Sequence, residues 1–180
     1  VQGCFEKLPC AWSNNIKKRI PSHKGVEMLS ANEVKMYAKA LGADAVGIAS
    51  AERFEGAPIQ MDPRQIMPEA KSVIAMAFRV MRGSLRGIEE GTFFSNYSSM
   101  GYGGLTYLYI PIVVINLAKY LEDNGFEAVP VGHQSDWRAI GENGEVRPRY
   151  SRAVEPGRAM PDVMVHLRIA AYLAGLGEIG

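Results

Sequence analysis

The side chains best suited to chemistry are phenols, two imidazoles and guanidinium groups in the second half of the chain. Tyr97 and Tyr102 lie among Ser, Asn and Gly residues, where a phenol can face a cavity and donate a proton. The alternative is that they are core aromatics, like their neighbours. Residues 132–160 form a long polar segment containing His133 and Arg149. Such a segment can bind an anionic or amide-rich ligand through its Arg side chains, or it can be a solvated loop.

A glycine pattern of the form G-x-G-x-x-G occurs at Gly175, Gly177 and Gly180. A dinucleotide-binding fingerprint requires a strand immediately before this pattern, whereas the preceding segment here is typical of a helix. Two interpretations remain: a glycine C-cap with a tight turn, or a backbone that lets a bulky cofactor approach closely. On the preceding helix, a lone His166 indicates a hydrogen-bonded structural residue more often than a ligand.

Two cysteines, Cys4 and Cys10, are the only thiols in the sequence. They cannot form a four-cysteine iron–sulfur or zinc site within this chain. Reduced thiols, a disulfide and an intermolecular role are the alternatives for the pair. The sequence contains neither the H-E-x-x-H motif of zinc proteases nor the G-x-S-x-G motif of serine hydrolases.

The composition is that of a globular domain: 180 residues, 47% hydrophobic and 22% charged. The formal net charge of +1 gives no basic excess, which argues against general nucleic-acid binding. The longest apolar stretch, residues 105–118, contains Pro111 and Asn116 and indicates a buried helix rather than a membrane span. We therefore expect a cytoplasmic protein with no membrane partner.

The elements that must position these groups alternate between helix and strand. A capping box at Ser30 and Glu33 predicts a helix that ends before Gly42. Further elements are predicted as strands over 45–49 and 72–80, a helix over 105–124 that Gly125 ends, a third strand over 126–131, and a helix over 164–174. The sequence thus predicts an N-terminal arm, residues 1–29, followed by one α/β domain over residues 30–180.

Four segments follow one another in a recognisable order: residues 38–48, 67–76, 117–130 and 170–180, with Tyr97 ahead of the long helix. Together they resemble the epoxyqueuosine reductase and reductive dehalogenase superfamily, in which a tyrosine likewise precedes the long helix. The last segment contains A-G-L-G-E-I-G at 174–180, similar to the family's A-G-L-G-x-I-G, its most specific motif.

The resemblance implies a nitroreductase-like layered α/β domain, with a mixed sheet flanked by helices, that binds a cobalamin-type corrinoid. It implies cofactor contacts from Gly175, Leu176, Gly177 and Gly180, and we add Tyr102, His133, Arg149 and His166 as candidate cofactor-binding residues. Tyr97 and Asp162 are the candidate proton donors. Asp162 is the carboxylate nearest to the family's acid, but the Ala-Pro that accompanies that acid is missing here.

In this superfamily a ferredoxin-like module after the A-G-L-G block carries two [4Fe-4S] clusters that reduce the cobalt. No cysteine follows Cys10 in this sequence, so we expect the clusters in a further module or a partner chain. The leading hypothesis is reductive C–O or C–halogen cleavage of a small molecule or modified nucleoside. The alternatives are a non-catalytic binding or assembly module and a flavin-binding, nitroreductase-like reductase.

Overall fold

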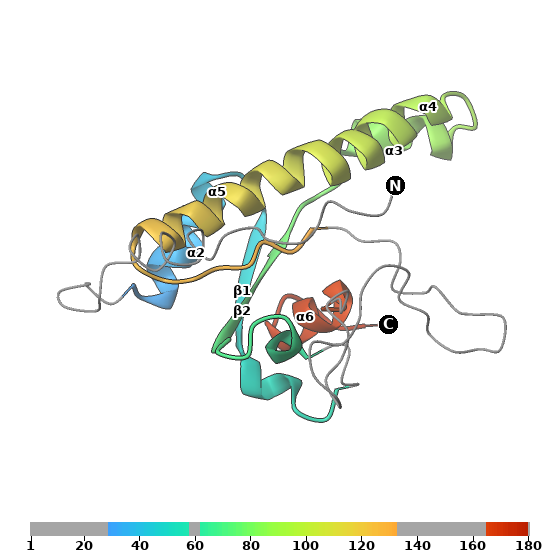
Figure 1. Cartoon of the computed structure of the whole chain (residues 1–180). Helices are drawn as coiled ribbons and strands as arrows, with labels where there is room; N and C mark the ends of the chain where they lie inside the picture. Colours follow the sequence, from blue (N-terminus) through green and yellow to red (C-terminus); the bar gives the residue numbers. More distant parts are fainter. Residues whose placement is uncertain (1–28, 58–61, 133–164, 180) are drawn as a thin grey trace, which may run out of the picture.

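The computed structural model describes residues 29–57, 62–132 and 165–179 (Figure 1). The predicted N-terminal arm therefore lies outside the described residues, except for Leu29. The elements are α2 (Ala31–Ala40), β1 (Ala45–Ser50), η1 (Ala51–Phe54), η3 (Pro63–Gln65), β2 (Ser72–Ala77), α3 (Arg82–Glu89), α4 (Phe94–Asn96), the π-helix η4 (Tyr97–Tyr109), α5 (Ile110–Asp123) and α6 (Leu167–Leu173).

The predicted capping box begins α2. Ser30 Oγ accepts a hydrogen bond from the Glu33 amide at 3.2 Å, and the Glu33 carboxylate accepts one from the Ser30 amide at 2.7 Å. The Ser30 hydroxyl also donates to the Glu33 carboxylate at 2.7 Å, and this bond, followed by the one from the Ser30 amide, lowers the pKa of Glu33. The helix ends before Gly42, whose φ of +116° is a conformation that favours glycine. Both predicted ends of this helix are confirmed.

The sheet in the described part of the chain has two antiparallel strands, with Ala45 opposite Ala77 and Ser50 opposite Ser72. The α/β class is confirmed in this coarse form. The predicted third strand is wrong, because residues 126–131 form no strand. Pro130 has no amide hydrogen to contribute to a ladder. The second strand also ends at Ala77, three residues earlier than predicted.

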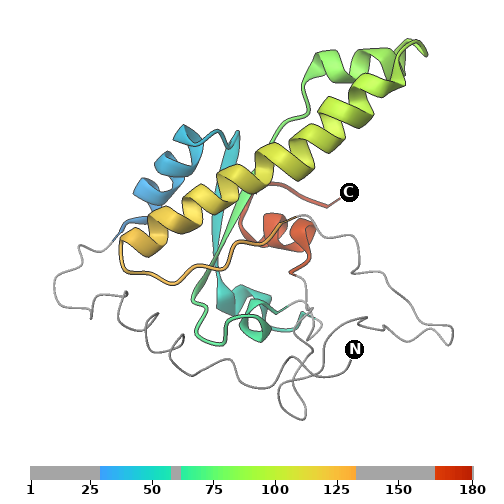
Figure 2. The same ribbon diagram turned by 45° about the horizontal axis from the view of Figure 1, so that its top comes forward.

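Two apolar clusters cover the two faces of the hairpin, because side chains alternate between faces along a strand. On one face Val46 packs with α2 and α5, in a cluster of Val34, Ala38, Ala43, Val46 and Leu117. On the other face Ala49 packs with η1 and α6, in a cluster of Ala49, Phe54, Val165 and Ala170. The described part therefore has three layers, with the strands in the middle (Figure 2).

One continuous helical segment runs from Phe94 to Asp123 and begins eleven residues before the predicted helix. Gly125, with φ +84°, ends it as predicted, through hydrogen bonds from Gly125 N to Glu122 O and from Phe126 N to Leu121 O. Its N-terminal part, together with α3 and α4, projects away from the sheet in both views (Figures 1 and 2).

The expectation that this helix is buried is wrong over most of its surface. Val113 and Leu117 are buried, while Leu108, Ile112 and Ile115 are exposed. By length and composition this is the one helix among the described residues that could cross a membrane, although a helix that packs on a core can pass the same test. Here α5 does pack, through Val113 and Leu117, on the body of the domain.

Candidate functional site

The turn that follows α6 contains the glycine pattern. Gly175 has φ +75°, its amide donates to Tyr172 O, and the Leu176 amide donates to Ala171 O, both at 2.9 Å. This pair of bonds is a Schellman cap, which requires the left-handed conformation that glycine adopts most easily. The C-cap interpretation of the pattern is therefore confirmed for Gly175 and Leu176.

Gly177 has no such structural explanation. Its φ lies outside the left-handed region, and an added Cβ would meet no atom of the described residues within 4 Å. A side chain at this position is therefore tolerated by the local fold. What the glycine provides is an open backbone surface beside the turn, which an external group can approach.

A shallow pocket of about 340 Å³ lies beside this turn, lined by Tyr172, Glu178 and Ile179. Tyr172 belongs to the last turn of α6, and Glu178 and Ile179 follow Gly177. The lining thus combines an aromatic ring, an aliphatic side chain and one carboxylate. This volume is at the lower end of the range for ligand pockets, so it can hold only one part of a large cofactor.

The position of α6 on the sheet depends on Gly47 in β1. A Cβ on Gly47 would overlap the carbonyl oxygen of Ala174 and would lie 2.9 Å from the Ala174 Cβ. The absence of a side chain therefore lets the C-terminal end of α6 lie directly on the strand. Residue-type reasoning did not single out Gly47, although a glycine inside a strand is a recognised signal of close backbone approach.

His166 lies at the opposite end of α6 from the glycine turn. Its Nδ1 accepts a hydrogen bond from the Ile169 amide at 3.4 Å, so the imidazole caps the first turn of the helix. This contact favours the structural interpretation of His166 and orients its ring toward its own helix.

Tyr97 and Tyr102 both lie in the π-helix η4, in the part of the long helix that projects from the sheet. The ring of Tyr97 is tilted against that of Phe94, with centroids 6.0 Å apart, and a Cβ on Gly101 would lie 3.1 Å from it. The structure therefore groups the two tyrosines in one element. It does not bring them to the turn after α6, which packs against the hairpin (Figures 1 and 2).

The hydroxyl groups of Tyr102 and Tyr107 are 3.2 Å apart, and their rings meet edge to face. This hydrogen bond, with a smaller contribution from burial, raises the pKa of Tyr102. The stabilisation from the protonated phenol is present at neutral pH and is lost as the pH rises through the raised pKa.

Replacing Tyr107 with Phe should lower the pKa of Tyr102, because the phenylalanine ring keeps the packing and removes the hydroxyl. Nuclear magnetic resonance of carbon-labelled tyrosines, followed during an alkaline titration, measures this change. Tyr172→Phe, on α6, is the control and should leave the titration of Tyr102 unaltered. An unchanged titration in Tyr107→Phe would contradict the assignment of this bond as the cause.

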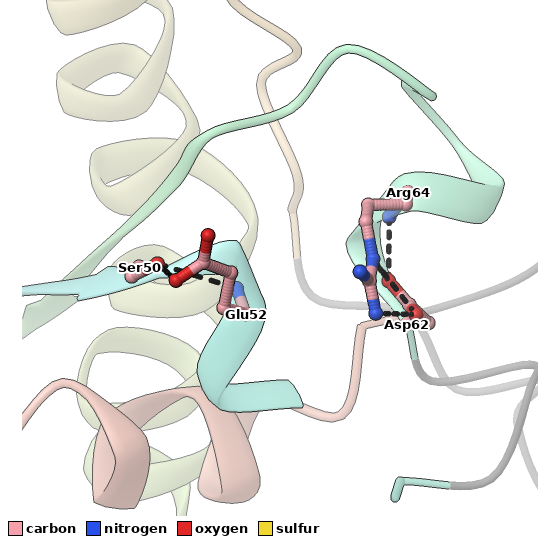
Figure 3. A network of polar contacts seen from close by, with 4 residues as sticks. All are labelled: Ser50, Glu52, Asp62 and Arg64. Carbon is pink, nitrogen blue, oxygen red and sulfur yellow. Dashed lines mark hydrogen bonds and ion pairs between the residues drawn. The ribbon is translucent and has the colours of Figure 1, made fainter. Parts of the chain in front are cut away.

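Two separate pairs of polar residues, Ser50 with Glu52 and Asp62 with Arg64, are hydrogen-bonded in the region from β1 to η3 (Figure 3). Asp62 accepts hydrogen bonds from the Arg64 amide at 2.9 Å and from its guanidinium at 2.7 Å, and Ser50 Oγ accepts from the Glu52 amide at 3.3 Å. The hydrogen bond from Arg64 lowers the pKa of Asp62. These contacts cap η3 and η1, and we assign them a structural role.

The other predicted site residues, His133, Arg149, Asp162 and Gly180, lie outside the described residues. Within the ranges that are described, no three His, Cys, Asp or Glu side chains are grouped as metal ligands would be.

The chain matches no protein-family model, no curated protein and no solved structure. The resemblance to the corrinoid reductases therefore rests on the sequence segments alone.

Proposed function

We propose that this chain is the corrinoid-binding part of a reductive enzyme that cleaves C–O or C–halogen bonds, with the layered fold of a nitroreductase-like domain. One observation carries the proposal. In the segment that resembles the family's most specific motif, neither the backbone φ at position 177 nor the packing around it requires a glycine. The α/β layers around a hairpin support the fold part of the proposal.

We propose that one edge of the corrinoid lies at the turn after α6. Two observations support this: the open backbone at Gly177, and the adjacent pocket lined by Tyr172, Glu178 and Ile179. The pocket is too small to enclose a corrin ring. We propose that His133, Arg149 and Gly180 add contacts to the same cofactor, with Tyr102 and His166 as further candidates.

When bound, the cofactor supplies the electrons that break the carbon–halogen or carbon–oxygen bond. The substrate takes up two electrons and one proton at the carbon, and the halide or oxygen group leaves. We propose Tyr97 and Asp162 as the protein groups that deliver that proton. Tyrosine is protonated near neutral pH without help, whereas a carboxyl group needs burial to raise its pKa.

We propose that the electrons come from a reductant outside these 180 residues, because no cysteine follows Cys10 in them to hold a cluster. We propose an iron–sulfur module or protein with [4Fe-4S] clusters as that donor. The substrate class is a small molecule or a modified nucleoside, and the proposed location is cytoplasmic.

The test is reconstitution of the purified chain with hydroxocobalamin, followed by desalting and a visible absorption spectrum. We expect the corrinoid bands to stay with the protein at about one cofactor per chain. A parallel sample with FMN distinguishes the alternatives, because retention of flavin alone would indicate a nitroreductase-like flavoprotein. A folded chain that retains neither would favour a binding or assembly module and would overturn the proposal.

A further inference from the structure

The carboxylate of Glu178 lines the pocket beside the glycine turn and is available to a ligand. In the part of the chain that the structure describes, its side chain has no hydrogen-bond or ion-pair partner. A carboxylate accepts hydrogen bonds and donates none, so the group that completes this pocket must be a donor. The two other lining residues, Tyr172 and Ile179, offer carbon surface beside the carboxylate.

The cap after α6 determines where these lining residues lie. The Gly175 amide donates to the Tyr172 carbonyl, and the Leu176 amide donates to the Ala171 carbonyl, both at 2.9 Å. Tyr172 therefore belongs to the same closed turn from which the chain continues through Gly177 to Glu178. Because no described atom lies within 4 Å of a Cβ at position 177, the backbone that leads to Glu178 stays open to a ligand.

The inference rests on the proposed function, because the ligand that we consider is the corrinoid. The edge of a cobalamin carries flexible arms, each a short chain of methylene carbons that ends in a primary amide. Such an arm matches the lining of the pocket, because its methylene carbons can contact Tyr172 and Ile179 while its N–H groups donate to Glu178. A pocket of about 340 Å³ can take an arm, although it is too small for the ring.

We propose that Glu178 accepts a hydrogen bond from one amide arm of the corrinoid and thereby selects which corrinoids the chain binds. A hydrogen bond to a charged acceptor is stronger than one between neutral groups. The same carboxylate repels a second carboxylate, so a corrinoid in which this arm has been hydrolysed to the acid is rejected. Glu178 is thus a specificity-determining residue, whereas Gly177 provides only the space for the ring edge.

The test is an equilibrium titration of the purified chain with hydroxocobalamin and with its monocarboxylic derivatives, in each of which one amide arm is hydrolysed. We expect the wild type to bind one of these derivatives at least about tenfold more weakly than hydroxocobalamin. In Glu178→Gln this difference should disappear, because a glutamine side chain both donates and accepts hydrogen bonds. Glu178→Lys should reverse the difference and bind that derivative more tightly than hydroxocobalamin.

The matched controls are Glu122→Gln and Glu122→Lys, which make the same changes of charge in the last turn of α5. That helix packs on the opposite face of the hairpin from α6. We expect both controls to discriminate among the corrinoids as the wild type does. Because Glu122 and Glu178 are exposed, all four variants should fold, and thermal unfolding followed by circular dichroism checks this.

The outcomes separate this inference from the proposed function. A wild type that binds hydroxocobalamin but shows no Glu178-dependent difference among the derivatives would overturn the role of Glu178 and leave the proposed function standing. A difference that Glu122→Lys also removes would overturn that role as well, because the net charge of the protein would then explain it. A folded wild type that does not bind hydroxocobalamin would contradict the proposed function, and the role of Glu178 with it.

Discussion

Replacing Gly47 with Val should destabilise the domain by roughly 3 kcal/mol, because β1 and the end of α6 leave no room for a side chain. The new Cβ would overlap the Ala174 carbonyl oxygen, which belongs to the backbone and cannot rotate away. For a domain of this size the loss corresponds to a fall in melting temperature of roughly 6–12 °C. Thermal unfolding followed by circular dichroism measures it.

The direction of the stability change in Gly47→Val distinguishes the tertiary contact with α6 from the intrinsic preference of valine for strands. Valine favours an extended strand more than glycine does, so strand propensity alone would raise the stability of Gly47→Val. Gly83→Val is the matched control, because a Cβ at Gly83 meets nothing within 4 Å. We expect the control to unfold at or above the wild-type temperature. Equal melting temperatures for the two variants would contradict the close approach of α6 to β1.

Hydrogen exchange adds a second readout for the same substitution. If α6 is displaced, amides in its last turn, such as those of Ala174 and Gly175, should lose protection. Amides of α2, on the opposite face of the hairpin, should exchange as in the wild type at temperatures well below unfolding.

Replacing Gly177 with Val should abolish corrinoid retention while leaving the melting temperature close to that of the wild type. The side chain would extend into the open space that we propose the cofactor occupies, and no described atom lies within 4 Å of its Cβ. We expect at least a tenfold loss of affinity for hydroxocobalamin, measured by absorption after desalting and by equilibrium titration.

Gly83→Val again serves as the control, because it adds the same side chain to open space far along the chain from the turn. Gly175→Val is a useful contrast, since Gly175 has φ +75° and its replacement should lower stability as well as binding. A folded Gly177→Val protein that retains the corrinoid like the wild type would remove the main support for the proposed site.

Several local features followed from the sequence because short-range hydrogen bonds and backbone geometry decide them. Ser30 and Glu33 complete a capping box within four residues, and Gly42 and Gly125 end helices through positive φ. The short apolar run at 45–49, bounded by turn residues, also located β1 to within one residue. The Gly175 cap belongs to the same group, because its two hydrogen bonds lie within one turn.

Contacts between distant segments decided the rest. Residues 126–131 have the apolar pattern of a strand, yet a strand exists only where another strand pairs with it, and this segment pairs with none in the described chain. In the same way, hydropathy predicted that residues 105–118 are buried. Burial depends on what covers each face, and only the side with Val113 and Leu117 meets the core.

The sequence by itself determined which residues end helices, which resemble a corrinoid-binding motif, and that no cluster-forming cysteines follow Cys10. Only the tertiary structure showed that Gly177 is open, with no described atom near its Cβ position, and that Gly47 positions α6. It also placed Tyr97 on the projecting helix, apart from the turn. The reason is physical: a cap forms between residues close in sequence, whereas an open surface or a close approach exists only after separate elements have packed.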